Sequence, residues 1–451
     1  MSRLGDFGSS GRPPRANPPI DDIRRTKEAS MRRVVMLIAV SVLGVALVVA
    51  AGALLVPWGD RSPASRETDP IAIAERRLER LPNDWKTWAE LGLAYVQRAR
   101  TTGDPADYPR AGKALDRSLA IRREDNAIAL TGLGALAAAG HDFPAALRHG
   151  RAALAVDPYR AAALGVVADA LTELGRYDEA FATVQRMVNL RPDAASYARA
   201  SYTWELRGDI GRATDAMRRA LDAAPNPADG AFARLHLGQL AFGTGDLDTA
   251  AAHFTEGLRL LPGHPPLRAG LARVRAARGD TTGAVAEFRA VLTAVLEPAY
   301  AVELGDLLTA TGQPEAGARE YTRAREAWAA EARNGHPPEP DPVLFAADHR
   351  DPAALDAARR LYTRQPGIGG ADAMAWALRA AGRPAEALRH ADEALRLGTR
   401  SALLHYHRGM ILADLGKREA ARAELETTLR LNPHFSARHA PEARAALVSL
   451  G

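Results

Sequence analysis

The chain has 451 residues, of which 47% are hydrophobic and only 6% aromatic, and it has no cysteine. The missing cysteine excludes a disulfide framework, a thiolate metal site and a cysteine nucleophile. The formal charge of +5 does not indicate a nucleic-acid partner: residues 1–33 hold eight Lys/Arg against four Asp/Glu, the remainder is nearly neutral, and no basic stripe is interleaved with aromatic residues.

The N-terminal part of the chain predicts a membrane anchor. Residues 1–33 lack apolar periodicity, and we expect them to be a disordered basic cytoplasmic tail. Residues 34–56 contain no charge, and as a helix they would span about 34 Å, enough for a hydrocarbon core of about 30 Å. The basic flank predicts a single-pass plasma-membrane protein with a cytoplasmic N-terminus and residues 57–451 outside. The alternative is a signal peptide cleaved near Ala51-Gly52-Ala53, which would give a secreted protein.

After a Pro/Ser linker at 57–69, the chain reads as a series of helices. Ile71 to Leu81 is amphipathic and ends at Pro82. The next unit carries Trp88, Leu91, Gly92 and Tyr95 in its first helix, and an insertion near Thr101 to Asp107 lengthens its hairpin loop. We expect this loop either to make specific contacts or to be a tolerated surface insertion.

The stretch from Ala161 to Pro192 shows the pattern most clearly. Apolar residues recur at helical spacing on both sides of Gly175-Arg176-Tyr177-Asp178. Asp178 and Glu179 open the second helix, where negative charge suits the helix dipole. Pro192 closes the unit 34 residues after Pro158. One such hairpin cannot bury its own apolar face, so the chain should contain more of them.

These residues resemble the tetratricopeptide repeat (TPR), in particular bacterial TPR proteins that are membrane-anchored or secreted. The W-x2-L-G-x2-Y motif lies at Trp88 to Tyr95, and the resemblance covers roughly residues 70–436. It implies an all-α superhelical solenoid of antiparallel helix pairs. We expect repeats over 70–333, a Pro-rich joint without helix over 334–342, further repeats over 343–436 with a degenerate hairpin at 343–366, and a capping helix over 437–451.

The resemblance also implies an inner groove that binds a protein or peptide, lined by the second, fifth, ninth and twelfth positions of each unit. The alternative is that these side chains pack between neighbouring units. No Lys/Asn clamp for a chaperone tail is present. The predicted groove residues are Tyr202, Glu205, Phe232, Leu235, Gln239, Phe242, Arg273, Asp306, Trp376, Tyr406 and Met410.

Nothing in the sequence indicates an enzyme, and we predict no catalytic, cofactor or metal site. His405 and His407 are two residues apart, so they diverge on a helix and are expected at the surface. Gln365 to Gly370 lacks a P-loop lysine and is expected to be a turn between hairpins. The sequence therefore predicts a membrane-tethered adaptor that binds a partner in its groove. The alternative is a self-assembling scaffold, hence a homo-oligomer.

Overall fold

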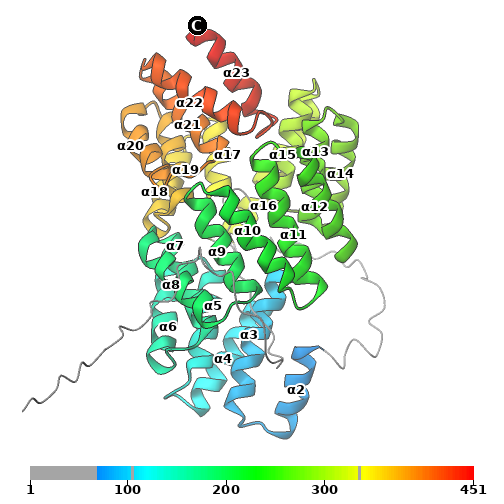
Figure 1. Cartoon of the computed structure of the whole chain (residues 1–451), viewed down its shortest axis with the longest axis vertical. Coiled ribbons are helices and arrows are strands. Elements are labelled where there is room, and N and C mark those ends of the chain that lie inside the picture. The colour runs from blue at the N-terminus through cyan, green and yellow to red at the C-terminus, as the bar shows by residue number, and fades with distance from the viewer. Residues whose placement is uncertain (1–68, 103–105, 334–336) are drawn as a thin grey trace, which may run out of the picture. The chain divides into compact units, whose positions relative to one another are not determined.

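The computed structural model describes residues 69–102, 106–333 and 337–451. Within these ranges the chain forms 22 α-helices and no strand (Figure 1). The helices are α2 (Pro70–Arg80), α3 (Trp85–Thr102), α4 (Asp107–Ile121), α5 (Ala127–Ala139), α6 (Phe143–Val156), α7 (Ala161–Glu173), α8 (Tyr177–Leu190), α9 (Ala194–Leu206), α10 (Ile210–Asp222), α11 (Pro227–Gly243), α12 (Leu247–Leu260), α13 (Pro265–Ala277), α14 (Thr281–Ala294), α15 (Pro298–Ala310), α16 (Pro314–Arg333), α17 (Pro340–Asp348), α18 (Ala354–Arg364), α19 (Ile368–Ala380), α20 (Pro384–Ala394), α21 (Ala402–Asp414), α22 (Arg418–Leu431) and α23 (His439–Leu450).

The predicted anchor cannot be compared with this structure. Residues 1–33, the span 34–56 and most of the linker 57–69 lie outside the described ranges, as does the centre of the insertion at 103–105. Among the helices that are described, none combines the length and the apolar character needed to cross a membrane.

Helices adjacent in sequence pack as hairpins, and the first helices of successive hairpins also pack on one another, as α3 does on α5 and α17 on α19 (Figure 1). Four of the second helices, α6, α10, α12 and α14, start at an aspartate cap. The Asp142 carboxylate accepts from the Ala145 N–H at 3.0 Å, and Asp209 does the same for Arg212. Such caps satisfy N–H groups that have no partner within the helix. The predicted all-α solenoid of helix pairs is therefore confirmed.

Small residues lie where the helices cross, as the sequence predicts. Ala146, Ala213 and Ala220 are at most 2% exposed. The packing around the Phe254 ring is close, because a Cβ added at Gly238 of α11 or at Gly270 of α13 would overlap that ring. Phe254 itself is buried. Glycine thus lets three helices close around one aromatic side chain.

The joint is shorter than predicted, because α17 already begins at Pro340, inside the segment expected to exclude helix. Proline is tolerated in the first turn, where its missing N–H would have had no partner in any case. The degenerate hairpin also folds as a helix pair, α17 and α18. Its turn has Arg350 at φ 52°, where other turns of the array have glycine.

The last part of the array packs back on the middle of the chain. We call residues 70–333 the N-terminal array and residues 340–451 the C-terminal array. The Ile368 N–H donates to the Tyr177 hydroxyl at 2.7 Å, the Thr399 hydroxyl donates to the Leu206 carbonyl at 2.5 Å, and the Asn432 amide donates to the Phe242 carbonyl at 2.8 Å. The partners in each pair are 190 to 193 residues apart. The solenoid therefore contacts itself at a nearly constant offset.

Candidate partner-binding face

The predicted groove residues all lie on the first helices of their hairpins. They are distributed over α9, α11, α13, α15, α19 and α21. Leu235, Trp376 and Tyr406 are buried, which leaves these three little surface for a partner. The other eight residues are half-buried: Tyr202, Glu205, Phe232, Gln239, Phe242, Arg273, Asp306 and Met410. Partner binding by this set stays a prediction.

Two Arg–carboxylate pairs link successive first helices along this face. The Arg199 guanidinium of α9 donates to both oxygens of Asp169 on α7, at 2.8 and 2.7 Å. The Arg273 guanidinium of α13 donates to both oxygens of Glu303 on α15, each at 2.6 Å. Bidentate pairs of this kind are strong and directional. These four charges therefore already have partners within the chain.

Glu205 on α9, which lies between the two pairs, has no such partner. Its carboxylate makes no hydrogen bond or ion pair with any residue that the structure describes. Burial raises the pKa of Glu205 to about 7. On α11, the Gln239 side chain accepts a hydrogen bond from His236, and its Oε1 atom is buried. Glu205 thus provides an acceptor for a donor from outside, whereas Gln239 does not.

Aromatic side chains flank Glu205 and Gln239. Tyr202 lies one helical turn before Glu205 on α9, and Phe232 and Phe242 lie on α11. All three rings are half-buried, and the Phe232 ring packs on His236 with centroids 4.3 Å apart. A face of half-buried rings with an unpaired acceptor, Glu205, can bind an apolar segment that also presents an N–H donor. We call Tyr202, Glu205, Phe232, Gln239 and Phe242 the groove face.

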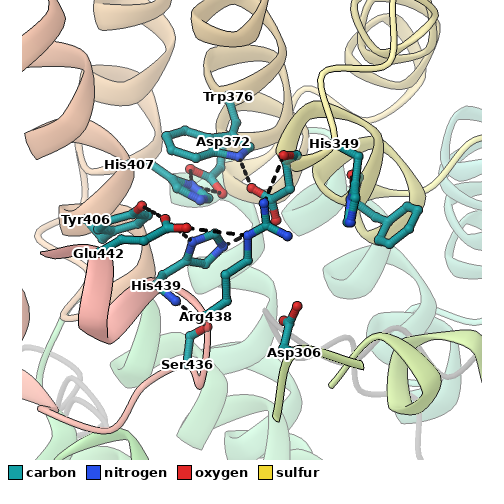
Figure 2. Close-up of polar contacts among 12 residues, drawn as sticks. Asp306, His349, Asp372, Trp376, Tyr406, His407, Ser436, Arg438, His439 and Glu442 are labelled. Carbon is teal, nitrogen blue, oxygen red and sulfur yellow. Dashed lines mark hydrogen bonds and ion pairs between the residues drawn. The ribbon is translucent and has the colours of Figure 1, made fainter. Parts of the chain in front are cut away.

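Trp376 and Tyr406 belong instead to a buried polar cluster under the last helix (Figure 2). The Trp376 indole N–H donates to Asp348 Oδ1 at 2.7 Å, and the Tyr406 hydroxyl donates to Glu442 at 2.5 Å. We call this the cap cluster. It comprises Asp348, Asp372, Trp376, Tyr406, His407, Arg438, His439 and Glu442.

His439 is central to the cap cluster. Its Nε2 is 3.3 Å from Asp348 Oδ2, and its Nδ1 is 3.1 Å from Glu442 Oε2. Burial alone would lower the pKa of His439, but these two carboxylates raise it to about 9. Burial would likewise raise the pKa of Asp348, yet hydrogen bonds from His439 and Trp376 lower it to about 2. At neutral pH the cluster therefore holds an imidazolium between two carboxylates.

The expectation for His407 is wrong. The side chain is only 1% exposed, its Nδ1 is 2.8 Å from Asp372 Oδ1, and its ring stacks on Trp376 with centroids 4.0 Å apart. His405 points elsewhere, as helical geometry requires, and pairs with Glu424 at 2.6 Å. His407 and Asp372 occupy facing first helices 35 residues apart. A polar pair at this near-repeat spacing is the signal that could have identified the buried contact.

In the ranges that the structure describes, no three His, Asp or Glu side chains are arranged to hold a metal ion. Of the predicted turn at Gln365 to Gly370, only Gln365 to Gly367 connects α18 to α19, because Ile368 to Gly370 already form the first turn of α19.

Family models and solved structures support the repeat assignment. Two models described as tetratricopeptide repeat match residues 136–201 and 241–301, and residues 197–265 and 373–434, which together make up just over half of the chain. No curated protein matches the chain in sequence.

Among solved structures, the chain is similar to the human IFIT1 dimer with m7Gppp-AAAA, at 16% identity and a TM-score of 0.50 over 73% of this chain and 76% of that one. It is also similar to the Cut9–Hcn1 hetero-tetramer of APC/C, at 14% identity and a TM-score of 0.44 over 86% and 70%. A third is TTC0263, a thermophilic TPR protein from Thermus thermophilus, at 21% identity and a TM-score of 0.37 over 41% and 98%. At these identities the similarity concerns the fold alone. With the repeated hairpins and the matching family models together, the chain belongs to the tetratricopeptide repeat family.

Proposed function

We propose that this protein is a TPR adaptor that binds a segment of a protein partner on its groove face. The observation that carries the proposal is Glu205, a half-buried carboxylate without a partner in the described residues, on a face whose other charges are paired in Asp169–Arg199 and Arg273–Glu303. Desolvating a carboxylate without compensation costs stability. A bound N–H or cationic group would remove this cost, and this supports a partner with donors at that position.

The aromatic side chains favour a peptide or protein partner. Phe232 and Phe242 provide apolar surface on one helix. Aromatic residues are typical anchors of protein interfaces, where they bury a large area at small entropic cost. An extended or helical segment with apolar side chains and exposed N–H groups would match this face.

We also propose that the adaptor is tethered to the plasma membrane through residues 34–56, with the repeats outside the cytoplasm. The support is the 23-residue stretch without charge and its basic N-terminal flank. Reporter fusions at residue 20 and at residue 451 should lie on opposite sides of the membrane, and the full chain should resist carbonate extraction. If the mature chain starts after residue 53 and appears in the medium, the protein is secreted instead.

Crosslinking the full chain in its own membranes and recovering it with its partners tests the adaptor function. The Phe232→Ala and Phe242→Ala double variant should lose the main partner while it keeps its helical circular dichroism. Tyr159→Ala is the control, because Tyr159 is an aromatic residue 76% exposed outside the groove face. Equal recovery with both variants would contradict binding at the groove face. Recovery of the chain alone would instead indicate self-assembly.

A further inference from the structure

We propose that the C-terminal array is an intramolecular clasp: its loops dock beside the groove face and restrict access to the α9 part of that face. The inference rests on the proposed function, because it describes how access to the same site is regulated. It follows from three features of the contact between the two arrays: matched hydrogen bonds, a shared apolar core and overlap with the groove face.

The hydrogen bonds are matched repeat by repeat. The Gly367 N–H donates to the Glu173 carbonyl at 3.1 Å, the Thr399 hydroxyl to the Leu206 carbonyl and the Asn432 amide to the Phe242 carbonyl. The three carbonyls lie at the ends of α7, α9 and α11, where a helix leaves its last carbonyls without partners. Three successive loops of the C-terminal array thus donate to carbonyls at three helix ends, although the Phe242 carbonyl also accepts from the Gly245 N–H.

A shared core accompanies these bonds. Ile368 and Leu404 of the C-terminal array are at most 4% exposed and belong to one apolar cluster with Tyr177 and Leu206 of the N-terminal array. Arg396 lies over the Tyr177 ring at 5.1 Å and donates to the Gly175 carbonyl at 2.7 Å. Burial of this apolar surface gives the contact most of its stability.

The contact reaches the groove face itself. Tyr202 packs against the apolar cluster that the two arrays share, and the Thr399 hydroxyl binds the carbonyl of Leu206, the residue after Glu205. The Phe242 carbonyl accepts a hydrogen bond from the Asn432 amide. Ala437 packs on the apolar core formed by α13 to α16. In Figure 2, Arg438 extends from the loop before α23 towards Asp348 of α17, and it donates to the Asp348 carbonyl at 3.0 Å. A partner on α9 and α11 would therefore compete with the clasp for space.

The turn glycines provide a matched pair of variants. Gly208 has φ +71°, and a Cβ added there would overlap the Gly398 carbonyl of the docked array. Gly279 has φ +83° in the equivalent turn of α13 and α14, and a Cβ there would meet nothing within 4 Å. Alanine at either position carries the cost of a left-handed backbone. Only Gly208→Ala also forces the two arrays apart.

The experiment measures opening and access separately in the full chain. Hydrogen exchange of the Gly367 and Ile368 amides reports opening, because both amides donate across the contact. Access is measured as the rate at which a polyethylene-glycol maleimide labels the thiol of Glu205→Cys. Labelling of Tyr159→Cys serves as the exposed reference. The chain has no native cysteine, so only the introduced thiol reacts.

We expect Gly208→Ala to speed both exchange at 367–368 and labelling at position 205 by about tenfold or more relative to Gly279→Ala, with labelling at 159 unchanged. Thr399→Val, which leaves the backbone unstrained, should act in the same direction by a smaller factor. Unchanged exchange in both Gly208→Ala and Thr399→Val would overturn the clasp. Faster exchange with unchanged labelling at 205 would show that the arrays separate without uncovering the groove face. Neither hydrogen exchange nor labelling requires a partner. A result that overturns the clasp is therefore distinct from a result that overturns partner binding.

Discussion

At the scale of single residues, the cap cluster concentrates charge where a solenoid end is usually held by apolar contacts alone. His439 faces Asp348 of α17, Glu442 and Tyr406, while Arg438 lies alongside and Asp306 approaches from α15. The imidazolium joins the last helix to α17, and removal of one partner from such a buried pair leaves the other uncompensated. The ion pairs of His439 thus hold α23 against α17.

The first prediction follows from the raised pKa of His439. A folded-state pKa of about 9 against an ordinary 6.5 stabilises the folded chain fully below pH 6.5. This contribution, about 3 kcal/mol, is lost as pH rises through 9. Thermal unfolding of the wild type should therefore show a fall in stability from pH 6.5 to 9.5.

His439→Gln should be less stable than the wild type at pH 6.5 and should lose much less stability over the same range. His434→Gln is the control, because His434 is exposed and its pKa is not raised. If the stability of the wild type and of His439→Gln changed with pH in parallel, the stabilising role of the charged His439 would be refuted.

At the scale of elements, glycine and alanine set how closely the hairpins stack. The second prediction concerns Gly238, whose missing Cβ makes room for Phe254. Gly238→Ala should lower the free energy of unfolding by about 1–3 kcal/mol, because an added methyl overpacks the core. Gly243→Ala in the same helix should be neutral or slightly stabilising, since nothing lies within 4 Å of its Cβ. Urea denaturation of the two variants measures the difference, and equal midpoints would contradict the packing argument.

The positions of most helices and hairpins could be predicted from the sequence. The 34-residue spacing, the turn glycines and the closing prolines locate most hairpins, because each reports a local backbone requirement. The start of α17 at Pro340 could not be predicted, because proline both ends helices and begins them. The burial of His407 also escaped prediction, since the position of a polar residue on a helix does not reveal whether a carboxylate such as Asp372 faces it.

At the scale of the whole molecule, the contact between the arrays changes how the repeats cooperate. In a simple solenoid each repeat contacts only its neighbours, so stability adds up locally. Here Thr399 and Asn432 join repeats that are about 190 residues apart. The sequence does not show this, because Gly367, Thr399 and Asn432 read as ordinary turn residues. Their partners are backbone carbonyls, which leave no trace in residue identity.

The third prediction tests this coupling. Asn432→Ala removes the hydrogen bond from Asn432 to the Phe242 carbonyl, which keeps its bond from the Gly245 N–H, and should destabilise by about 0.5–1.5 kcal/mol. Because the lost bond joins the arrays, hydrogen exchange should accelerate in α11 as well as in α21 to α23. Asn126→Ala is the control, a buried asparagine whose bonds to Ser118, Arg122 and Ala129 stay local. Acceleration confined to the C-terminal array in Asn432→Ala would show that the arrays are not coupled.

The most direct measurement of the central claim, that the groove face binds a protein partner, is site-specific photocrosslinking of the full chain in its own membranes. A photoreactive amino acid would replace Glu205 in one sample and Tyr159 in another. We expect one dominant protein crosslinked at position 205 and absent at position 159, with this crosslink lost in the Phe232→Ala and Phe242→Ala background. No crosslinked protein at 205, or the same proteins at both positions, would contradict it.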